Sequence, residues 1–138
     1  MDHLSKTERS ALMRKIGGKN TQPEIVVRRV LHAMGLRFRL HVKTILGTPD
    51  IVLPRHKTVV FVHGCFWHRH PGCSRAYTPH TRTSFWMQKF DCNVARDREV
   101  QESLRKEGWR VIVIWECQTF PKNLDVLRTI LANAFGQS

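Results

Sequence analysis

The sequence predicts a single α/β domain in which helices flank a mixed central sheet. Three observations lead to this prediction. The chain has 138 residues, which suits one domain spanning 1–138 and leaves little room for two. Hydrophobic residues make up 41% of the chain, which is enough to build a core. Two short apolar runs, Thr58–Val62 and Val111–Trp115, alternate with stretches of helical periodicity.

The N-terminal part of the chain is predicted to be helical. Apolar residues spaced among Arg and Lys over residues 5–16 predict a short basic helix within the segment 1–19, and Gly17-Gly18 ends it. Thr21-Gln-Pro-Glu24 then supplies an N-cap residue, a proline in the first turn and a glutamate at the capping-box position. A second helix is therefore expected to run to about Met34.

Three extended segments follow. Arg37–Val42 alternates apolar and basic residues, which predicts a strand with one side facing solvent. Gly47-Thr-Pro predicts a turn before a strand at Asp50–Leu53. Thr58–Val62 is almost continuously apolar, as in a central strand that is buried on both faces.

The second half of the chain begins with an irregular segment. Residues 63–81 are rich in Gly, Pro and His, and a loop of this length in a small domain is usually functional or needs a staple. A long helix is expected over Thr83–Glu107, a buried strand over Arg110–Trp115 and an amphipathic helix over Lys122–Phe135. This order of elements predicts a single α/β layer with a mixed sheet.

The charge of the chain indicates a polyanionic partner. Its 23 Lys and Arg residues exceed its 11 Asp and Glu residues, giving a formal net charge of +12. Nucleic acid is the commonest partner of such a protein, and an anionic membrane surface is a rarer one. No apolar run approaches the ~20 residues that span a bilayer, and the N-terminus has no apolar signal segment. A cytoplasmic protein is therefore expected. In its reducing environment, clustered Cys and His residues are interpreted as metal ligands in preference to disulfide-bonded cysteines.

One Cys/His cluster has the composition of a structural zinc site. Structural Zn²⁺ prefers four tetrahedral nitrogen or sulfur ligands, and we assign one ion per chain to Cys65, His70, Cys73 and Cys117. Cys65 and Cys117 each follow an apolar strand, so a shared sheet edge would bring them together. The alternative is a set of unrelated buried thiols and solvent-exposed histidines. The remaining cysteine, Cys92, is expected to be an ordinary helix residue.

Carboxylates and histidines near the predicted strand ends suit phosphodiester chemistry. Asp50, at the start of a strand, is a candidate ligand for Mg²⁺ held against a phosphate, although Pro-Asp is more often simply a turn. Glu24 either completes the capping box or faces the sheet edge and supports metal-bound water. His63 and His68 are candidates for proton transfer, with Asp97 orienting the ring. The alternative is that these histidines are ordinary polar loop residues.

Large aromatic residues lie in and beside the polar loop. Phe66-Trp67 and Trp86 neighbour basic residues, and proteins that distort duplex DNA insert such side chains between base steps. Alternatively, Trp67 and Trp86 pack on each other over the sheet. A core position is expected for Phe85, Trp109 and Trp115.

Several of these segments together resemble one known family. They are His63-Gly-Cys-Phe-Trp-His68, His70-Pro-Gly-Cys73, Thr83-Ser-Phe-Trp86, Asn93-Val-Ala-Arg96-Asp97 and Gly108–Cys117, with further matches at Ser10–Arg14 and Gly47–Asp50. This pattern closely resembles the very-short-patch-repair (Vsr) DNA mismatch endonucleases. The resemblance extends over nearly the whole chain, from about Ser5 to Phe135.

The resemblance implies a restriction-endonuclease-like fold of the PD-(D/E)xK superfamily with a structural zinc. It also implies a Mg²⁺-dependent nick 5′ to the thymine of a T:G mismatch, which arises when 5-methylcytosine deaminates. The implied partner is double-stranded DNA containing a mismatch, and a monomer without membrane attachment is expected. A functional association with a cytosine-5 DNA methyltransferase and with downstream repair proteins follows. The alternatives are a zinc-stabilised mismatch-binding module without turnover and a nicking enzyme with broader mismatch specificity.

The resemblance also implies roles for individual residues. Asp50 and the backbone carbonyl of Val62 resemble the magnesium ligands. His68 resembles the general base and Asp97 its orienting partner, with His63 at the phosphate and Glu24 in support. The zinc ligands are Cys65, His70, Cys73 and Cys117, and the DNA-binding residues are Phe66, Trp67 and Trp86 in the wedge and Met13 and Arg14 in the N-terminal helix.

Overall fold

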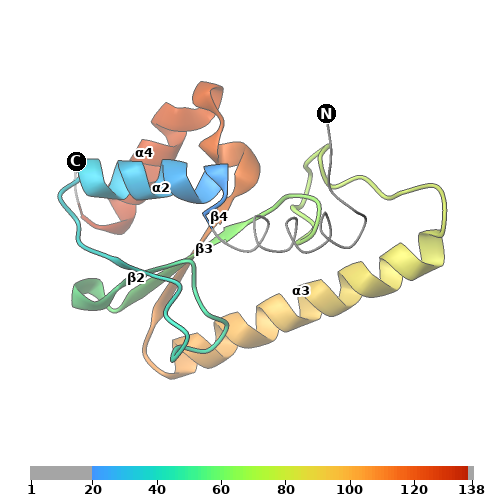
Figure 1. The fold of residues 1–138 in the computed structure, drawn as a ribbon, viewed down its shortest axis with the longest axis horizontal. Coiled ribbons are helices and arrows are strands. Elements are labelled where there is room, and N and C mark those ends of the chain that lie inside the picture. Colours follow the sequence, from blue (N-terminus) through green and yellow to red (C-terminus); the bar gives the residue numbers. More distant parts are fainter. Residues whose placement is uncertain (1–19, 137–138) are drawn as a thin grey trace, which may run out of the picture.

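The centre of the protein is a four-stranded sheet, as seen in a computed structural model that describes residues 20–136 (Figure 1). In spatial order its strands are β1 (Arg39–Leu40), β2 (Ile51–Leu53), β3 (Thr58–His63) and β4 (Arg110–Trp115). The basic N-terminal helix predicted within residues 1–19, and the DNA contacts predicted for Met13 and Arg14, lie outside the described residues.

The sheet is mixed, as predicted. β1 pairs with β2 and β2 with β3 in antiparallel fashion, whereas β3 and β4 are parallel. β3 is almost entirely buried, as expected for its apolar run. The prediction of a buried β4 was too strong, because this strand lies at the edge of the sheet and most of its residues are only partly buried.

Helices flank the sheet, as predicted, but they cover both of its faces, so the description as a single α/β layer was wrong. Figure 1 shows α2 (Gln22–Ala33) and α4 (Leu124–Ala134) on one face and the long α3 (Thr83–Lys106) on the other. The cause is the alternation of side chains along each strand, which gives every apolar strand two apolar faces. Val60 packs with α2 and α4, while its neighbours Val59 and Phe61 pack with Leu104 of α3.

The local signals at the start of α2 act as the sequence predicts. Thr21 is the N-cap, its hydroxyl accepts the backbone N–H of Glu24 at 3.5 Å, and Pro23 lies in the first turn. No helix among residues 20–136 is both long enough and apolar enough to cross a membrane.

The first strand is much shorter than the predicted Arg37–Val42. His41 has a φ of +46°, a left-handed conformation that interrupts an extended chain. Phe38 therefore packs against the α2–α4 core and Val42 against the α3 core, and Leu40 is exposed. The strand prediction was wrong about the extent of this element because its apolar residues serve two different cores.

One face of α3 carries a continuous stripe of contact residues. Trp86, Phe90, Asn93, Asp97 and Leu104 recur at the spacing of helical turns, and all are at least partly buried. The C-terminal end of this stripe packs on the sheet through Leu104. The other members face the loop of residues 64–82 and the cleft described next.

Candidate functional site

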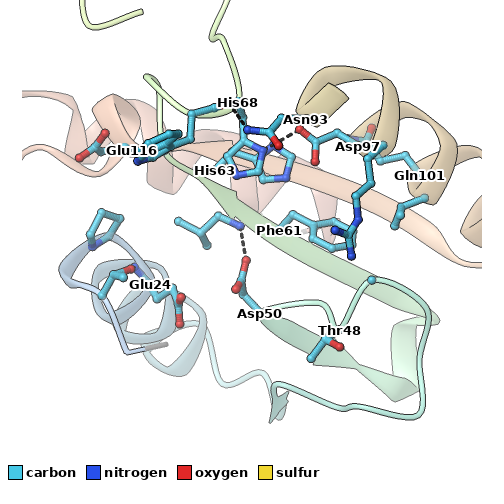
Figure 2. Close-up of a pocket in the computed structure, with 18 residues that line it drawn as sticks. Glu24, Thr48, Asp50, Phe61, His63, His68, Asn93, Asp97, Gln101 and Glu116 are labelled. Atoms are coloured by element: carbon cyan, nitrogen blue, oxygen red, sulfur yellow. Dashed lines mark hydrogen bonds and ion pairs between the residues drawn. The ribbon is translucent and has the colours of Figure 1, made fainter. Parts of the chain in front are cut away.

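The ends of three strands meet at one edge of the sheet. Because β3 and β4 are parallel, with His63 opposite Trp115, both strands end there. Because β2 is antiparallel to β3, it begins there, with Asp50 directly before its first residue. Residues far apart in sequence thereby line a single cleft of about 570 Å³, shown in Figure 2.

Asp50 is fixed to the neighbouring strand. Its Oδ2 accepts the backbone N–H of Val62 at 2.7 Å. Burial raises the pKa of Asp50 to about 7; the Val62 N–H opposes this shift, and the nearby Glu24 carboxylate adds to it. Two carboxylates this close favour a cation between them, because a cation relieves both their desolvation and their repulsion.

The backbone carbonyl of Val62 lies beside this aspartate. Continuing the β2–β3 register beyond Ile51 brings Pro49 opposite Val62. Proline has no N–H, so it cannot complete the ladder at that carbonyl. The register therefore leaves a carbonyl oxygen available next to the Asp50 carboxylate, and both are the hard oxygen donors that Mg²⁺ prefers.

Glu24 lies at the start of α2 and also lines the cleft, but it does not complete the predicted capping box, because its side chain accepts the N–H of Asn20 rather than that of the N-cap Thr21. It is 3% exposed, and its Oε2 receives the backbone N–H of Asn20 at 3.2 Å and the Arg28 guanidinium at 2.9 Å. It also lines the cleft, facing Asp50 as Figure 2 shows. The carboxylate thus fastens the start of α2 while presenting charge to the site.

His41 is a site residue that the sequence did not reveal. Its Nε2 lies 3.0 Å from Oε2 of Glu24, and its backbone N–H donates to the carbonyl of Asp50 at 3.3 Å. Ligand atoms of Glu24, His41 and Asp50 fall within 4.8 Å of one another. No local pattern indicates this role, because it depends on the left-handed turn at His41.

Replacing His41 should therefore reduce stability in a way that depends on the hydrogen bond. His41→Leu is expected to lower the free energy of unfolding by about 1–3 kcal/mol, because the buried Glu24 carboxylate loses a donor. His41→Gln retains an N–H donor and is expected to lose less than half of that. Urea denaturation measures both, with the exposed His32→Leu as the matched control. Equal stability of the Leu variant and wild type would contradict the assignment.

A pair of stacked histidines faces Asp50 across the cleft. The rings of His63 and His68 are 3.9 Å apart and nearly parallel, and Nδ1 of His68 lies 2.6 Å from Oδ2 of Asp97 on α3. The carboxylate accepts from Nδ1–H, which leaves Nε2 of His68 as the acceptor. Burial lowers the pKa of His63 to about 4, with help from the adjacent His68, so His63 is neutral at pH 7.

The predicted Cys/His cluster comes together two residues beyond the ends of β3 and β4. Ligand atoms of Cys65, His70, Cys73 and Cys117 lie within 4.8 Å of one another. Nδ1 of His70 is 3.6 Å from Sγ of Cys65 and 3.5 Å from Sγ of Cys117. Burial lowers the pKa of His70, which favours the neutral imidazole that binds metals. The fourth cysteine, Cys92, is exposed on α3, as expected.

Trp115 connects this cluster to the histidine pair, a role that its predicted place in the core missed. Its ring stacks on His70 at 4.4 Å and meets the edge of His63 at 5.4 Å. Glu116, the next residue, accepts the backbone N–H of Cys65 and the Arg75 guanidinium, each at 3.3 Å. The Cys/His cluster and the cleft are thus parts of one packed unit.

The aromatic residues of the loop and of the start of α3 form a partly exposed group, here called the aromatic cluster. Its members are Phe66, Trp67, Tyr77, Phe85, Trp86 and Phe90. Trp67 and Trp86 do contact each other, at 5.8 Å, yet Trp67 is 45% exposed. Phe85 is 43% exposed, so its predicted core position was wrong. Among the three residues expected in the core, Trp109 comes nearest, packing beside the α3 core while partly exposed.

Positive charges border the exposed side of the aromatic cluster. The Arg82 guanidinium lies 4.3 Å from the Phe85 ring, and Nζ of Lys89 lies 5.8 Å from the rings of both Trp67 and Phe85. Exposed aromatic rings among cations suit stacking on bases beside a phosphate backbone.

Comparison with known proteins finds DNA mismatch endonucleases and nicking enzymes. A family profile described as "DNA mismatch endonuclease Vsr" matches residues 1–75. A type II nicking enzyme, V.XorIIP of Xanthomonas oryzae pv. oryzae, is 46% identical over 99% of this chain and 98% of its own. A second, V.NmeAIP of Neisseria meningitidis, is 44% identical over 85% and 83%. The DNA mismatch endonuclease Vsr of Escherichia coli is 42% identical over 84% of this chain and 74% of its own.

Proposed function

The chain belongs to the DNA mismatch endonuclease Vsr family, and we propose that it nicks one strand of duplex DNA 5′ to the thymine of a T:G mismatch. The family makes it a DNA endonuclease; the T:G specificity and the Mg²⁺ dependence are our proposal. One observation carries it. Asp50 and the His63–His68–Asp97 group face each other across one cleft, beside an exposed aromatic cluster.

The donor atoms suit two different metals. Asp50 and the Val62 carbonyl would hold Mg²⁺, supported by Glu24, because all of these are oxygen donors. Cys65, His70, Cys73 and Cys117 would hold Zn²⁺, because three thiolates and an imidazole form a common structural zinc set. When bound, Mg²⁺ supplies charge that polarises the phosphoryl group and balances the leaving oxygen. The zinc would hold the loop of residues 64–82 in one conformation.

The histidine pair suits proton transfer to and from the scissile group. Nε2 of His68 is the free acceptor on a ring held by Asp97, so it would remove the proton from the attacking water. The resulting imidazolium is stabilised by the Asp97 carboxylate at 2.6 Å. Neutral His63, stacked on His68, would hydrogen-bond to a phosphate oxygen. The two rings thereby separate the role of base from that of phosphate binding.

The aromatic cluster suits recognition of the mismatch. Opening a base step costs a few kcal/mol, and less where the pair is already mismatched. Phe66, Trp67 and Trp86 would insert there, with Lys89 and Arg82 near the backbone. The N-terminal helix with Met13 and Arg14 is proposed to contact the DNA as well. We propose that the whole chain is one endonuclease domain and that it acts as a monomer. It would cut at mismatches that arise at the methylation sites of a cytosine-5 DNA methyltransferase, and downstream repair proteins would then use the nick.

The function is tested by a nicking assay on end-labelled duplexes that contain one T:G pair or its T:A counterpart. With Mg²⁺, we expect a cut in the thymine strand 5′ to the mismatched thymine and an intact opposite strand. Equal cutting of the paired duplex would overturn the proposed specificity. Tight binding of the T:G duplex without a cut in Mg²⁺ or Mn²⁺ would instead favour the binding-module alternative, and a panel of all mismatches tests for broader specificity.

Replacing the orienting carboxylate should slow the reaction without weakening binding. Asp97→Asn is expected to reduce single-turnover nicking by about a hundredfold or more, because the base loses its orientation and its counter-charge. Asp91→Asn removes the same charge from an exposed position on α3 and is expected to leave the rate unchanged. An unchanged rate in Asp97→Asn, or an equal loss in Asp91→Asn, would contradict the role of Asp97.

A further inference from the structure

Arg69 lies between the proposed base His68 and the metal-ligand residue His70. It adopts a left-handed conformation with φ of +58°. Its guanidinium donates to the carbonyl of Phe66 at 3.3 Å, to those of Tyr77 and Ala76 at 2.9 and 2.8 Å, and to the Thr78 hydroxyl at 3.2 Å. One side chain thereby joins the two arms of the loop.

The same guanidinium also contacts α3. It lies over the aromatic cluster, with its Cζ 3.9 Å from the Phe90 ring centroid and 5.8 Å from that of Phe66. Phe90 is 2% exposed and belongs to the contact stripe of α3. Arg69 therefore fixes the loop arm that carries Phe66-Trp67 against the helix that carries Trp86.

The Cys/His cluster does not include the last part of this loop, which Arg69 holds instead. Three of its members lie in the loop, and the last of them is Cys73, ten residues before α3 begins at Thr83. The segment 76–78 lies in that stretch, and Arg69 holds it through three of its four hydrogen bonds. The planar guanidinium, whose N–H donors form a rigid fork, suits the holding of several acceptors better than the single ammonium of a lysine would.

We propose that Arg69 is a positioning residue that sets the preference for mismatched over paired DNA. This proposal rests on the proposed function. A rigid aromatic wedge must open a base step whenever it binds, and opening is cheaper at a mismatch. A flexible wedge can instead move out of the base stack on paired DNA, so its affinities for the mismatched and the paired duplex become similar. Loss of the Arg69 fork is therefore expected to weaken binding of the mismatched duplex and to spare the paired one.

The test compares dissociation constants for T:G and T:A duplexes of one sequence, without Mg²⁺, for full-length zinc-loaded variants. Arg69→Lys keeps the charge and loses the fork, and it is expected to lower the T:G/T:A affinity ratio about tenfold, the worth of one or two hydrogen bonds. Thr78→Val removes one acceptor without changing charge and is expected to lower the ratio less, in the same direction. Arg105→Met removes an exposed arginine of α3 and is expected to leave the ratio unchanged.

Each outcome separates the inference from its premise. A ratio preserved in Arg69→Lys and Thr78→Val overturns the role of Arg69 while the nicking activity stands. Equal weakening on both duplexes also overturns it, since it shows a general loss of DNA binding or of folding rather than a loss of discrimination. If wild type shows no preference for T:G DNA, the proposed function itself has failed. Metal content and thermal melting, measured for each variant, show whether Thr78→Val must replace an unfolded Arg69 variant as the deciding measurement.

Discussion

Asp50→Asn is expected to reduce Mg²⁺-dependent nicking of a T:G duplex by about a thousandfold or more, because a bound divalent ion supplies several kcal/mol of charge stabilisation in the transition state. Asparagine keeps an oxygen that accepts the Val62 N–H, so the sheet edge is retained. Affinity for the mismatched duplex should change little. Single-turnover cleavage and filter binding on the same protein measure the two effects. Nicking at the wild-type rate would show that Asp50 does not hold the metal.

The same substitution carries a stability prediction with a defined sign. The pKa of Asp50 is raised by burial from 3.8 to about 7, so the folded protein binds a proton more tightly than the unfolded chain. The stabilising contribution of this carboxyl is present below pH 4 and is lost as the pH rises to 7. Asp50→Asn is therefore expected to raise stability by about 1–3 kcal/mol at pH 8 without added Mg²⁺, and by much less at pH 4. Denaturant titrations at both pH values test it.

Removal of the metal from the Cys/His cluster is the second large expected effect. Purified protein should contain about one Zn²⁺ per chain, and its removal by a chelator should lower stability by at least about 3 kcal/mol, because structural zinc contributes more than that. Hydrogen exchange should show the loss concentrated in residues 64–82, while β2 and β3 stay protected, since their core does not include the loop.

Matched variants locate that effect. Cys117→Ser removes one member of the cluster and is expected to reproduce the chelator result, whereas Cys92→Ser alters an exposed thiol of α3 and should match wild type. Thermal melting with metal analysis measures both. A metal-free wild type that is fully folded and as stable as the loaded protein would end the zinc assignment.

Much of the scaffold could be predicted because it depends on local patterns. The capping residues before α2, the apolar runs of β2 and β3 and the length of α3 each have a signal within a few adjacent residues. The meeting of Cys65 and Cys117 also followed from sequence, since two buried strands joined by a helix tend to be parallel neighbours and end at one edge.

What escaped prediction depends on contacts between distant segments. His41 reaches Glu24 only because the chain turns left-handed where a strand was expected. Trp115 has the surroundings of a core residue in sequence, and only the β3–β4 register places its ring between two histidines. Arg69 looks like one charge among many, and its four acceptors lie in two loop arms that sequence cannot align.

The stripe on α3 has a consequence for where the strand is cut. Trp86 and Asp97 are eleven residues apart on one face of an unbroken helix of 24 residues, a rise of ~16 Å at 1.5 Å per residue. Under the proposed function, Trp86 contacts the mismatch at one end of this interval, and Asp97 orients the proton-accepting histidine at the other. The rise of the helix then fixes the distance between the aromatic side chains that open the base step and the histidine that removes the proton, so the cut falls at the phosphate 5′ to the mismatched thymine whatever the flanking bases are.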